Sequence, residues 1–217
     1  MLEIHSITTG PFQENCHILQ NPATMEIVVV DPGDDAPELT DFLQRLGGRV
    51  VAIWNTHGHI DHIGANAAVQ RETSAPISIH EMEQEWLGSA MLCGAAIFGI
   101  PFEPSKAETL WKGGETISAL GCEWKVRHAP GHSPGMCTIS CDAENLIIVG
   151  DLIMMNSIGR TDLPGGDERA MAKSLSEFFK YAKPDWRMLC GHGDRSTVQK
   201  EIRLNENARY MISEFGF

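Results

Sequence analysis

The stretch Thr56-His57-Gly58-His59-Ile60-Asp61-His62 places four side chains of metal-binding type within six positions. It follows Val50–Trp54, an apolar run typical of a strand that is buried on both faces. Alternate residues of an extended segment face the same side, so His57 and His59 are expected to point together. The last two residues are expected to enter the next helix. This spacing differs from the helical H-E-x-x-H zinc motif, whose histidines are four residues apart.

Three later segments also lead from apolar residues through a glycine to a histidine or an aspartate. They end at His132, Asp151 and His192. Ligands of open α/β sheets gather at strand ends, so neighbouring strands can deliver these groups to one edge. We therefore expect one site that contains His57, His59, Asp61, His62, His132, Asp151 and His192. Imidazoles mixed with carboxylates suit zinc or iron.

Seven ligands suffice for two divalent metal ions that share one carboxylate. The expected division is His57, His59 and His132 for one ion, Asp61, His62 and His192 for the other, and Asp151 between them. Zinc is the expected metal, and iron or a mixed zinc–iron pair is compatible with the same ligands. Asp31 is expected to hydrogen-bond backbone near the site. The other histidines are interpreted as structural: His5, His17, His80 and His128.

Strands and helices alternate around these motifs. The expected strands are Leu2–Thr8, Cys16–Gln20, Glu26–Val30, Val50–Trp54, Pro76–Ile79, Cys122–Arg127, Cys137–Cys141, Leu146–Val149 and Arg187–Cys190. The expected helices are Pro37–Leu46, His62–Glu72, Ala170–Ala182 and one that a capping box of Ser196 and Gln199 opens and that runs to about Ile212. Without repeats or a linker, this mixture indicates a single layered α/β or α+β domain over residues 1–217.

The composition narrows the class of partner. The chain has 217 residues, 42% of them hydrophobic and 21% charged, which is ordinary for a globular protein. Basic residues number 17 and acidic residues 29, so the net charge is −12. Proteins that bind nucleic acids neutralise phosphates with Lys and Arg, so this balance argues against a nucleic-acid partner.

The sequence shows no sign of a membrane span or an export signal. The longest apolar candidate, Ala90–Phe102, is interrupted by Gly94, Gly99 and Pro101. Met1–Pro11 has no basic residue and only short apolar pairs, unlike a secretory signal. The six cysteines form no C-x-x-C pair, so reduced thiols and a cytoplasmic location are expected, with no membrane partner. The oligomeric state is left open, and Ala90–Phe102 suits a pocket cover or a subunit interface.

The pattern H-x-H-x-D-H, followed by a His, an Asp and a His after successive strands, resembles the metallo-β-lactamase superfamily from about Gly10 to Asn205. The resemblance implies a four-layer αββα sandwich with metals at one edge between two sheets. Several segments are similar to the short bacterial glyoxalase-II-like branch, whose members act on hydroxyacyl-glutathione: Gly10–Cys16, Phe98–Pro101, Ser157–Asp167, Gly191–Gly193, Ser196–Val198 and Glu201. The chain departs from that branch at Leu152–Met155 and Asp194. It also has a short stretch after His192 where full-length glyoxalase II has a helical glutathione-binding domain.

The resemblance implies a metal-dependent hydrolase, in first place a glyoxalase-II-like thioesterase. In that reaction a hydroxide that bridges the metals attacks the carbonyl of hydroxyacyl-glutathione or a similar small thioester. Asp151 is expected to hold both ions, and Asp61 to bind the second ion or orient water. Arg160 is the candidate for a substrate carboxylate, with pairing to Asp162 as the alternative. The candidates for an apolar substrate wall are Ile97, Phe98, Met154 and Met155.

Other functions fit parts of the pattern. Persulfide dioxygenases resemble this superfamily and use a single iron, which His57, His132 and Asp151 could supply. Lactonase relatives place a tyrosine near the metals, but the two tyrosines, Tyr181 and Tyr210, lie in expected helices. A non-catalytic metal-binding module would have lost ligands or closed a four-ligand site. The missing export signal disfavours lactam hydrolysis, and there is no room for the additional domain of nuclease relatives.

Overall fold

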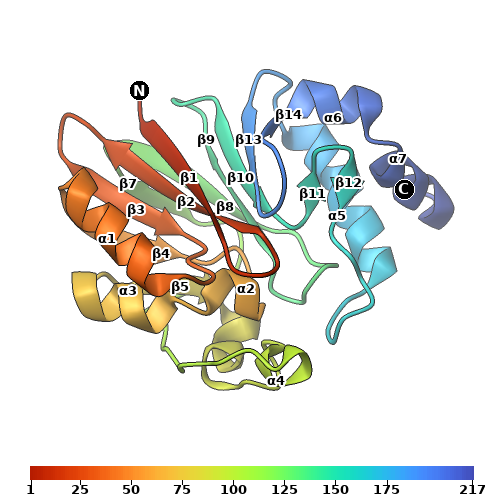
Figure 1. The fold of residues 1–217 in the computed structure, drawn as a ribbon. Coiled ribbons are helices and arrows are strands. Elements are labelled where there is room, and N and C mark those ends of the chain that lie inside the picture. The colour runs from red at the N-terminus through yellow and green to blue at the C-terminus, as the bar shows by residue number, and fades with distance from the viewer.

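Two six-stranded β-sheets lie face to face in the computed structural model, which describes residues 1–217, and helices cover both outer faces (Figure 1). The first sheet has the strand order β1-β2-β3-β4-β5-β6. The second has the order β14-β13-β10-β9-β8-β7, and β11 and β12 form a separate hairpin. The layers are helix, sheet, sheet and helix, which confirms the expected αββα sandwich.

The first sheet is antiparallel at its N-terminal edge and parallel from β3 onward. Its strands are β1 (Glu3–Thr9), β2 (Glu14–Asn21), β3 (Glu26–Val30), β4 (Arg49–Trp54), β5 (Ile77–His80) and β6 (Thr109–Trp111). The helical elements of this half are α1 (Ala36–Leu46), α2 (Ile60–Ile63), α3 (Asn66–Thr73), the 3₁₀ helix η1 (Glu81–Gly88) and α4 (Ala95–Phe98). Leu39, Val69 and Leu87, from α1, α3 and η1, belong to one apolar cluster with the outer face of this sheet.

The second sheet is antiparallel except where β10 pairs with β13. Its strands are β7 (Thr116–Ala119), β8 (Cys122–His128), β9 (Cys137–Cys141), β10 (Leu146–Gly150), β13 (Arg187–Cys190) and β14 (Ser196–Thr197). The remaining elements are β11 (Ile153–Met154), β12 (Ser157–Ile158), α5 (Glu168–Tyr181), α6 (Val198–Leu204) and α7 (Glu206–Phe215). Met171, Phe178 and Ala208 of α5 and α7 pack on the outer face of this sheet.

Three tryptophans fill part of the space between the sheets. The ring centroid of Trp54 on β4 lies 5.2 Å from that of Trp124 on β8 and 6.5 Å from that of Trp111 on β6, both edge to face. All three side chains are buried. Aromatic pairs favour this geometry, so the rings connect the two sheets by specific contacts as well as by apolar burial.

Several short elements were not expected from the sequence, namely β6, β7, β11, β12, β14, η1 and α4. Six of these seven span two to four residues, which is too short for a period of alternating or helical hydrophobicity to be visible. The expected helix His62–Glu72 is divided into α2 and α3. The division occurs because the N–H of Ala65 donates to the carbonyl of Pro32 at 2.9 Å instead of continuing a helix. No helix is both long enough and apolar enough to span a membrane.

The helix expected from Ser196 to Ile212 is also divided, into α6 and α7. Its expected capping box was wrong by one residue. Thr197 caps α6 by accepting a hydrogen bond from the N–H of Lys200 at 3.3 Å, whereas the hydroxyl of Ser196 donates to Glu201. Helix α6 ends at Leu204, and the next residue, Asn205, is both its C-cap and the N-cap of α7.

Asn205 is fully buried and connects α7 to the β11–β12 hairpin. Its Oδ1 accepts from the N–H of Ala208 at 3.0 Å, and its Nδ2 donates to the carbonyls of Met154 and Ser157 at 3.1 and 2.8 Å. These contacts stabilise the β11–β12 hairpin, which directly precedes the loop that holds Arg160.

Replacing Asn205 with alanine is expected to destabilise the fold by about 2–4 kcal/mol, because a cap is lost and buried carbonyls lose their donor. Denaturant unfolding measures this loss. Asn207→Ala is the control, since Asn207 is exposed and donates one hydrogen bond, to Asn156. If both variants changed the free energy of unfolding by less than about 0.5 kcal/mol, the role assigned to Asn205 would be wrong.

Candidate metal centre

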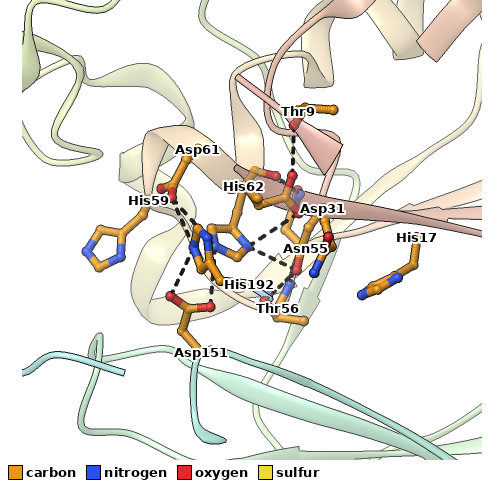
Figure 2. Close-up of polar contacts among 12 residues, drawn as sticks. Thr9, His17, Asp31, Asn55, Thr56, His59, Asp61, His62, Asp151 and His192 are labelled. Atoms are coloured by element: carbon orange, nitrogen blue, oxygen red, sulfur yellow. Dashed lines mark hydrogen bonds and ion pairs between the residues drawn. The ribbon is translucent and has the colours of Figure 1, made fainter. Parts of the chain in front are cut away.

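The seven predicted ligands lie together where strands of both sheets end. His57 and His59 follow β4, and Asp61 and His62 lie on α2 directly after them. The second sheet contributes the other three, His132 between β8 and β9, Asp151 after β10 and His192 after β13. Figure 2 shows Asp61, His62, Asp151 and His192 pointing toward one another from these separate elements. Each sheet therefore supplies part of a shared group.

His57, His59 and His132 form the first ligand group, with ring nitrogens within 4.8 Å of one another. His132 Nε2 lies 2.8 Å from His59 Nδ1 and 3.2 Å from His57 Nε2. All three side chains are buried. This is the arrangement expected for one metal ion held by three histidines.

Asp61, His62 and His192 form the second group, also within 4.8 Å. His192 Nε2 lies 3.3 Å from Asp61 Oδ2. Asp151 lies between the two groups: its Oδ1 is 3.6 Å from His62 Nε2, and its Oδ2 is 3.5 Å from both His132 Nε2 and His192 Nε2. One carboxylate thus reaches both sets of ligands, as the shared position requires.

The chemistry of this group fits bound cations. His62 Nε2 and Asp151 Oδ1 are buried, face each other, and have no hydrogen-bond partner. Buried polar atoms are normally paired, so two such atoms beside further nitrogens and oxygens indicate a site for a cation. The nitrogens and carboxylate oxygens are ligands that zinc and iron both accept.

The protonation of the first group also suits metal binding. Burial lowers the pKa of His57 well below its usual value, and it lowers the pKa of His59 to about 3 and that of His132 as well. Metals bind neutral imidazole, so these side chains need not lose a proton first.

The second group is electrostatically different. Burial opposes a charge on His62 and His192, but nearby carboxylates outweigh it and raise the pKa of both imidazoles. Burial likewise opposes ionisation of Asp61, and the two histidines outweigh it and lower the pKa of this carboxyl. The Asp61 carboxylate therefore carries a negative charge that a bound cation would neutralise.

Hydrogen bonds behind the ligands orient their rings. Asp31 accepts from the N–H and the hydroxyl of Thr56, both at 2.7 Å, and lies 3.2 Å from His62 Nδ1 (Figure 2). The Nδ1 atoms of His132 and His192 lie 2.7 and 3.1 Å from backbone carbonyls. Such contacts fix which nitrogen faces a metal. Asp31 thus has the supporting position expected for it.

Glu83 is a buried residue of the site region that the sequence analysis missed. Its Oε2 accepts from the N–H of Gly58 at 2.5 Å and its Oε1 from the N–H of Gly135 at 2.6 Å. A Cβ at Gly135 would lie 2.8 Å from Glu83 Cγ, so glycine permits this close approach. Burial raises the pKa of Glu83 to about 7, against hydrogen bonds that lower it. One carboxylate thus connects the His57–His59 loop to the loop of His132.

A pocket of about 180 Å³ opens beside the ligands. Its polar part is formed by His59, Asp61, His132 and His192. The apolar part includes Phe12, Ile60, Leu92, Ile97, Phe98, Leu163 and Pro164. Five residues of Ala90–Phe102 line it, so this segment forms part of the pocket wall.

The expected substrate-binding residues have different positions. Phe98 and Ile97 line the pocket, and so does Arg160. The guanidinium of Arg160 pairs with Asp162, at 2.6 and 2.7 Å, which was the alternative interpretation of this residue. Its binding of a substrate carboxylate stays a prediction. Met154 and Met155 do not line this pocket; Met154 packs instead against the core cluster beneath α5.

The residues interpreted as structural lie outside the seven-residue group. His17 contacts Ser6 Oγ and the carbonyl of Cys190, and burial lowers its pKa to about 4. His80 and His128 stack on each other with ring centroids 4.2 Å apart. The tyrosines are also elsewhere: Tyr181 contacts Thr138 and Tyr210 is exposed. No tyrosine lines the pocket beside the ligands, unlike what a lactonase would show.

Comparisons with known proteins agree with this geometry. The crystal structure of BLEG-1 B3 metallo-beta-lactamase superposes with a TM-score of 0.90 at 33% identity, covering 94% of this chain and 98% of that one. The structure of TTHA1623 in a di-iron-bound form gives a TM-score of 0.82 at 31% identity, covering 93% and 98%. Hydroxyacylglutathione hydrolase GloC of Haemophilus influenzae is 27% identical over 94% of this chain and 97% of its own length.

The model of the Metallo-beta-lactamase superfamily matches residues 9–192, which include most strands of both sheets and all seven ligand positions. The expected resemblance is thereby confirmed at the level of the family. Together with the fold and the gathered ligands, this match shows that the chain belongs to the metallo-β-lactamase superfamily of metallo-hydrolases.

Proposed function

We propose that this protein is a metal-dependent thioester hydrolase of the glyoxalase-II-like type, with hydroxyacyl-glutathione as the first reference substrate and other small thioesters as the class. The observation that carries the proposal is the gathering of all seven expected ligands beside one small pocket, whose floor four of them form. The similarity to GloC over nearly the whole chain supports the reaction class.

The residues have separable roles in this proposal. His57, His59 and His132 would hold one cation, Asp61, His62 and His192 would hold the other, and Asp151 lies within reach of both groups. Two such cations supply a hydroxide near neutral pH and polarise a carbonyl oxygen. Asp31 keeps His62 oriented, and Glu83 holds the two histidine loops at a fixed separation.

The overall reaction consumes one water. Its oxygen adds to the thioester carbonyl, the carbon–sulfur bond breaks, and a carboxylate, a thiol and a proton are released. A thiolate leaves readily, so the reaction needs no strong protein acid next to the sulfur. The pocket beside the ligands, with His59 and Asp61 on its floor, provides space for the substrate.

Metal analysis tests the proposal most directly. We expect close to two metal ions per chain, zinc or zinc with iron, and thioester hydrolysis that a chelator abolishes and added metal restores. Removal of metal is also expected to lower Tm, because ligands that bind the folded state stabilise it.

Two other results would contradict the proposal, and each would support a different function. A single iron per chain with oxygen uptake on glutathione persulfide would support a persulfide dioxygenase instead. Hydrolysis of a β-lactam but of no thioester would support a lactamase, the activity named for the similar BLEG-1 structure.

A further inference from the structure

The pocket beside the ligands has an apolar wall that is open to solvent. Phe12 is 38% exposed, Leu92 40%, Ile97 50% and Phe98 43%. They come from two separate places, the β1–β2 turn and the segment around α4. The rings of Phe12 and Phe98 meet edge to face with centroids 5.1 Å apart, so the two segments form one continuous surface.

Exposed apolar side chains that gather on one surface usually mark a place where a ligand or partner binds. Here the surface continues into the pocket floor that contains His59, Asp61, His132 and His192. A molecule whose reacting carbonyl lies over this floor would place its adjoining atoms against the apolar wall. The wall is therefore part of the substrate site.

The charges of the pocket further restrict what the wall can bind. Arg160 is the sole lysine or arginine that lines it, and Asp162 already accepts two hydrogen bonds from its guanidinium. Asp61 adds negative charge to the floor. The glutathione portion of a substrate carries carboxylates, for which this pocket has no unpaired cationic side chain, and the proposed metal ions face the reacting carbonyl. The pocket, about 180 Å³ in volume, is bordered by half-exposed side chains, so the thiol portion can extend from it into solvent.

We infer that the preferred thioesters carry an apolar acyl group, which packs against Phe12, Leu92, Ile97 and Phe98 while the thiol portion extends into solvent. This inference rests on the proposed thioester hydrolase activity and specifies its substrate class. A hydroxyl on the part of the acyl chain that packs on the wall loses water contacts without gaining a partner there, so acyl groups that carry one at that position are the poorer substrates.

A series of acyl-glutathiones with the metal-loaded enzyme tests the inference, because the thiol stays constant. From acetyl through butyryl to hexanoyl, kcat/KM is expected to rise by about fourfold for each methylene that is buried. Hexanoyl-glutathione is expected to be hydrolysed faster than 6-hydroxyhexanoyl-glutathione, which differs by one hydroxyl at the far end of the acyl chain. A flat or falling series, or a preference for the hydroxylated compound, would overturn the inference while leaving the thioesterase proposal intact.

Variants test whether the dependence of kcat/KM on acyl-chain length comes from the apolar wall. Ile97→Asn is expected to lower the hexanoyl-to-acetyl ratio of kcat/KM by about fourfold or more, since polar surface replaces the half-exposed isoleucine. Leu204→Asn is the matched control, because Leu204 is 56% exposed on α6 and does not line the pocket. An equal change of the ratio in both variants would contradict the assignment.

Calorimetry provides a readout that does not depend on turnover. The carboxylate products, from acetate to hexanoate, are titrated into the metal-loaded protein. Binding is expected to tighten with chain length and to show an increasingly negative heat-capacity change, the marker of apolar burial. If no thioester were hydrolysed, the proposed function would fall. If thioesters were hydrolysed but product binding did not depend on chain length, the inference alone would fall.

Discussion

Replacing Asp151 with alanine is expected to lower kcat/KM for thioester hydrolysis by about 10³-fold or more, because metal activation of a carbonyl is worth several kcal/mol and about 1.4 kcal/mol changes a rate tenfold. Asp151 is the one residue within 3.6 Å of nitrogens from both ligand groups. Its loss removes the shared carboxylate and a negative charge that the second cation requires. Metal content is expected to fall together with activity.

The measurement pairs kinetics with metal content on protein that thermal unfolding shows to be folded. Asp185→Ala is the control, since Asp185 is an exposed aspartate on the turn before β13, at the opposite end of that strand from His192. His59→Ala provides a second test, because it removes a ligand from the first group only. If folded Asp151→Ala and His59→Ala proteins both kept full activity, the catalytic assignment would be wrong.

Replacing Glu83 with alanine is the second change for which we expect a large effect. Its carboxylate accepts from the N–H groups of Gly58 and Gly135, and both donors would be left buried without a partner. Each unsatisfied donor costs about 1–3 kcal/mol, so the variant is expected to lose about 2–5 kcal/mol of stability. For a chain of this length that corresponds to a fall in Tm of roughly 5–15 °C.

The same variant should also bind metal more weakly, which separates a positioning role from a purely structural one. Gly58 lies between His57 and His59, so a freed loop misplaces two ligands of the first group. Metal affinity is measured below Tm, on protein that is still folded. Glu83→Gln keeps the shape of the side chain, but its amide N–H₂ faces one of the two N–H donors. We expect its stability and metal affinity to lie between those of the parent protein and of Glu83→Ala.

Glu85→Ala is the control on the same element, because Glu85 is an exposed glutamate of η1. It is expected to leave the free energy of unfolding within about 0.5 kcal/mol of the parent protein. A Glu83→Ala protein with unchanged Tm and unchanged metal affinity would show that Glu83 does not position the site.

The gathering of the seven residues could be predicted because each of them follows the end of an apolar strand. The cluster from His57 to His62 is dense enough to be recognised alone, and His132, Asp151 and His192 repeat the same order of strand, glycine and polar residue. The strands themselves are buried and apolar, so their positions were predicted closely, and with them the edge where their ends meet.

What could not be predicted depends on contacts between residues distant in the sequence. Glu83 stands among Glu81 and Glu85 in a charged segment that is indistinguishable from a solvated surface until Gly58 and Gly135 are seen beside it. Asn205 interrupts a helix because carbonyls of the hairpin lie within reach. Arg160 could have faced a substrate or Asp162, and the sequence offered no reason to choose.

The division of the ligands between two sheets has a consequence for the life of the protein in the cell. Four of the expected ligands belong to the first half of the chain and three to the second, so metal bound by the whole group would link the two halves. A chain made when metal is scarce would lack this link. Its open, partly unfolded forms would be more populated, because the free energy of metal binding no longer stabilises the folded state. Proteases degrade open forms, so we expect the abundance of the protein to follow the supply of metal.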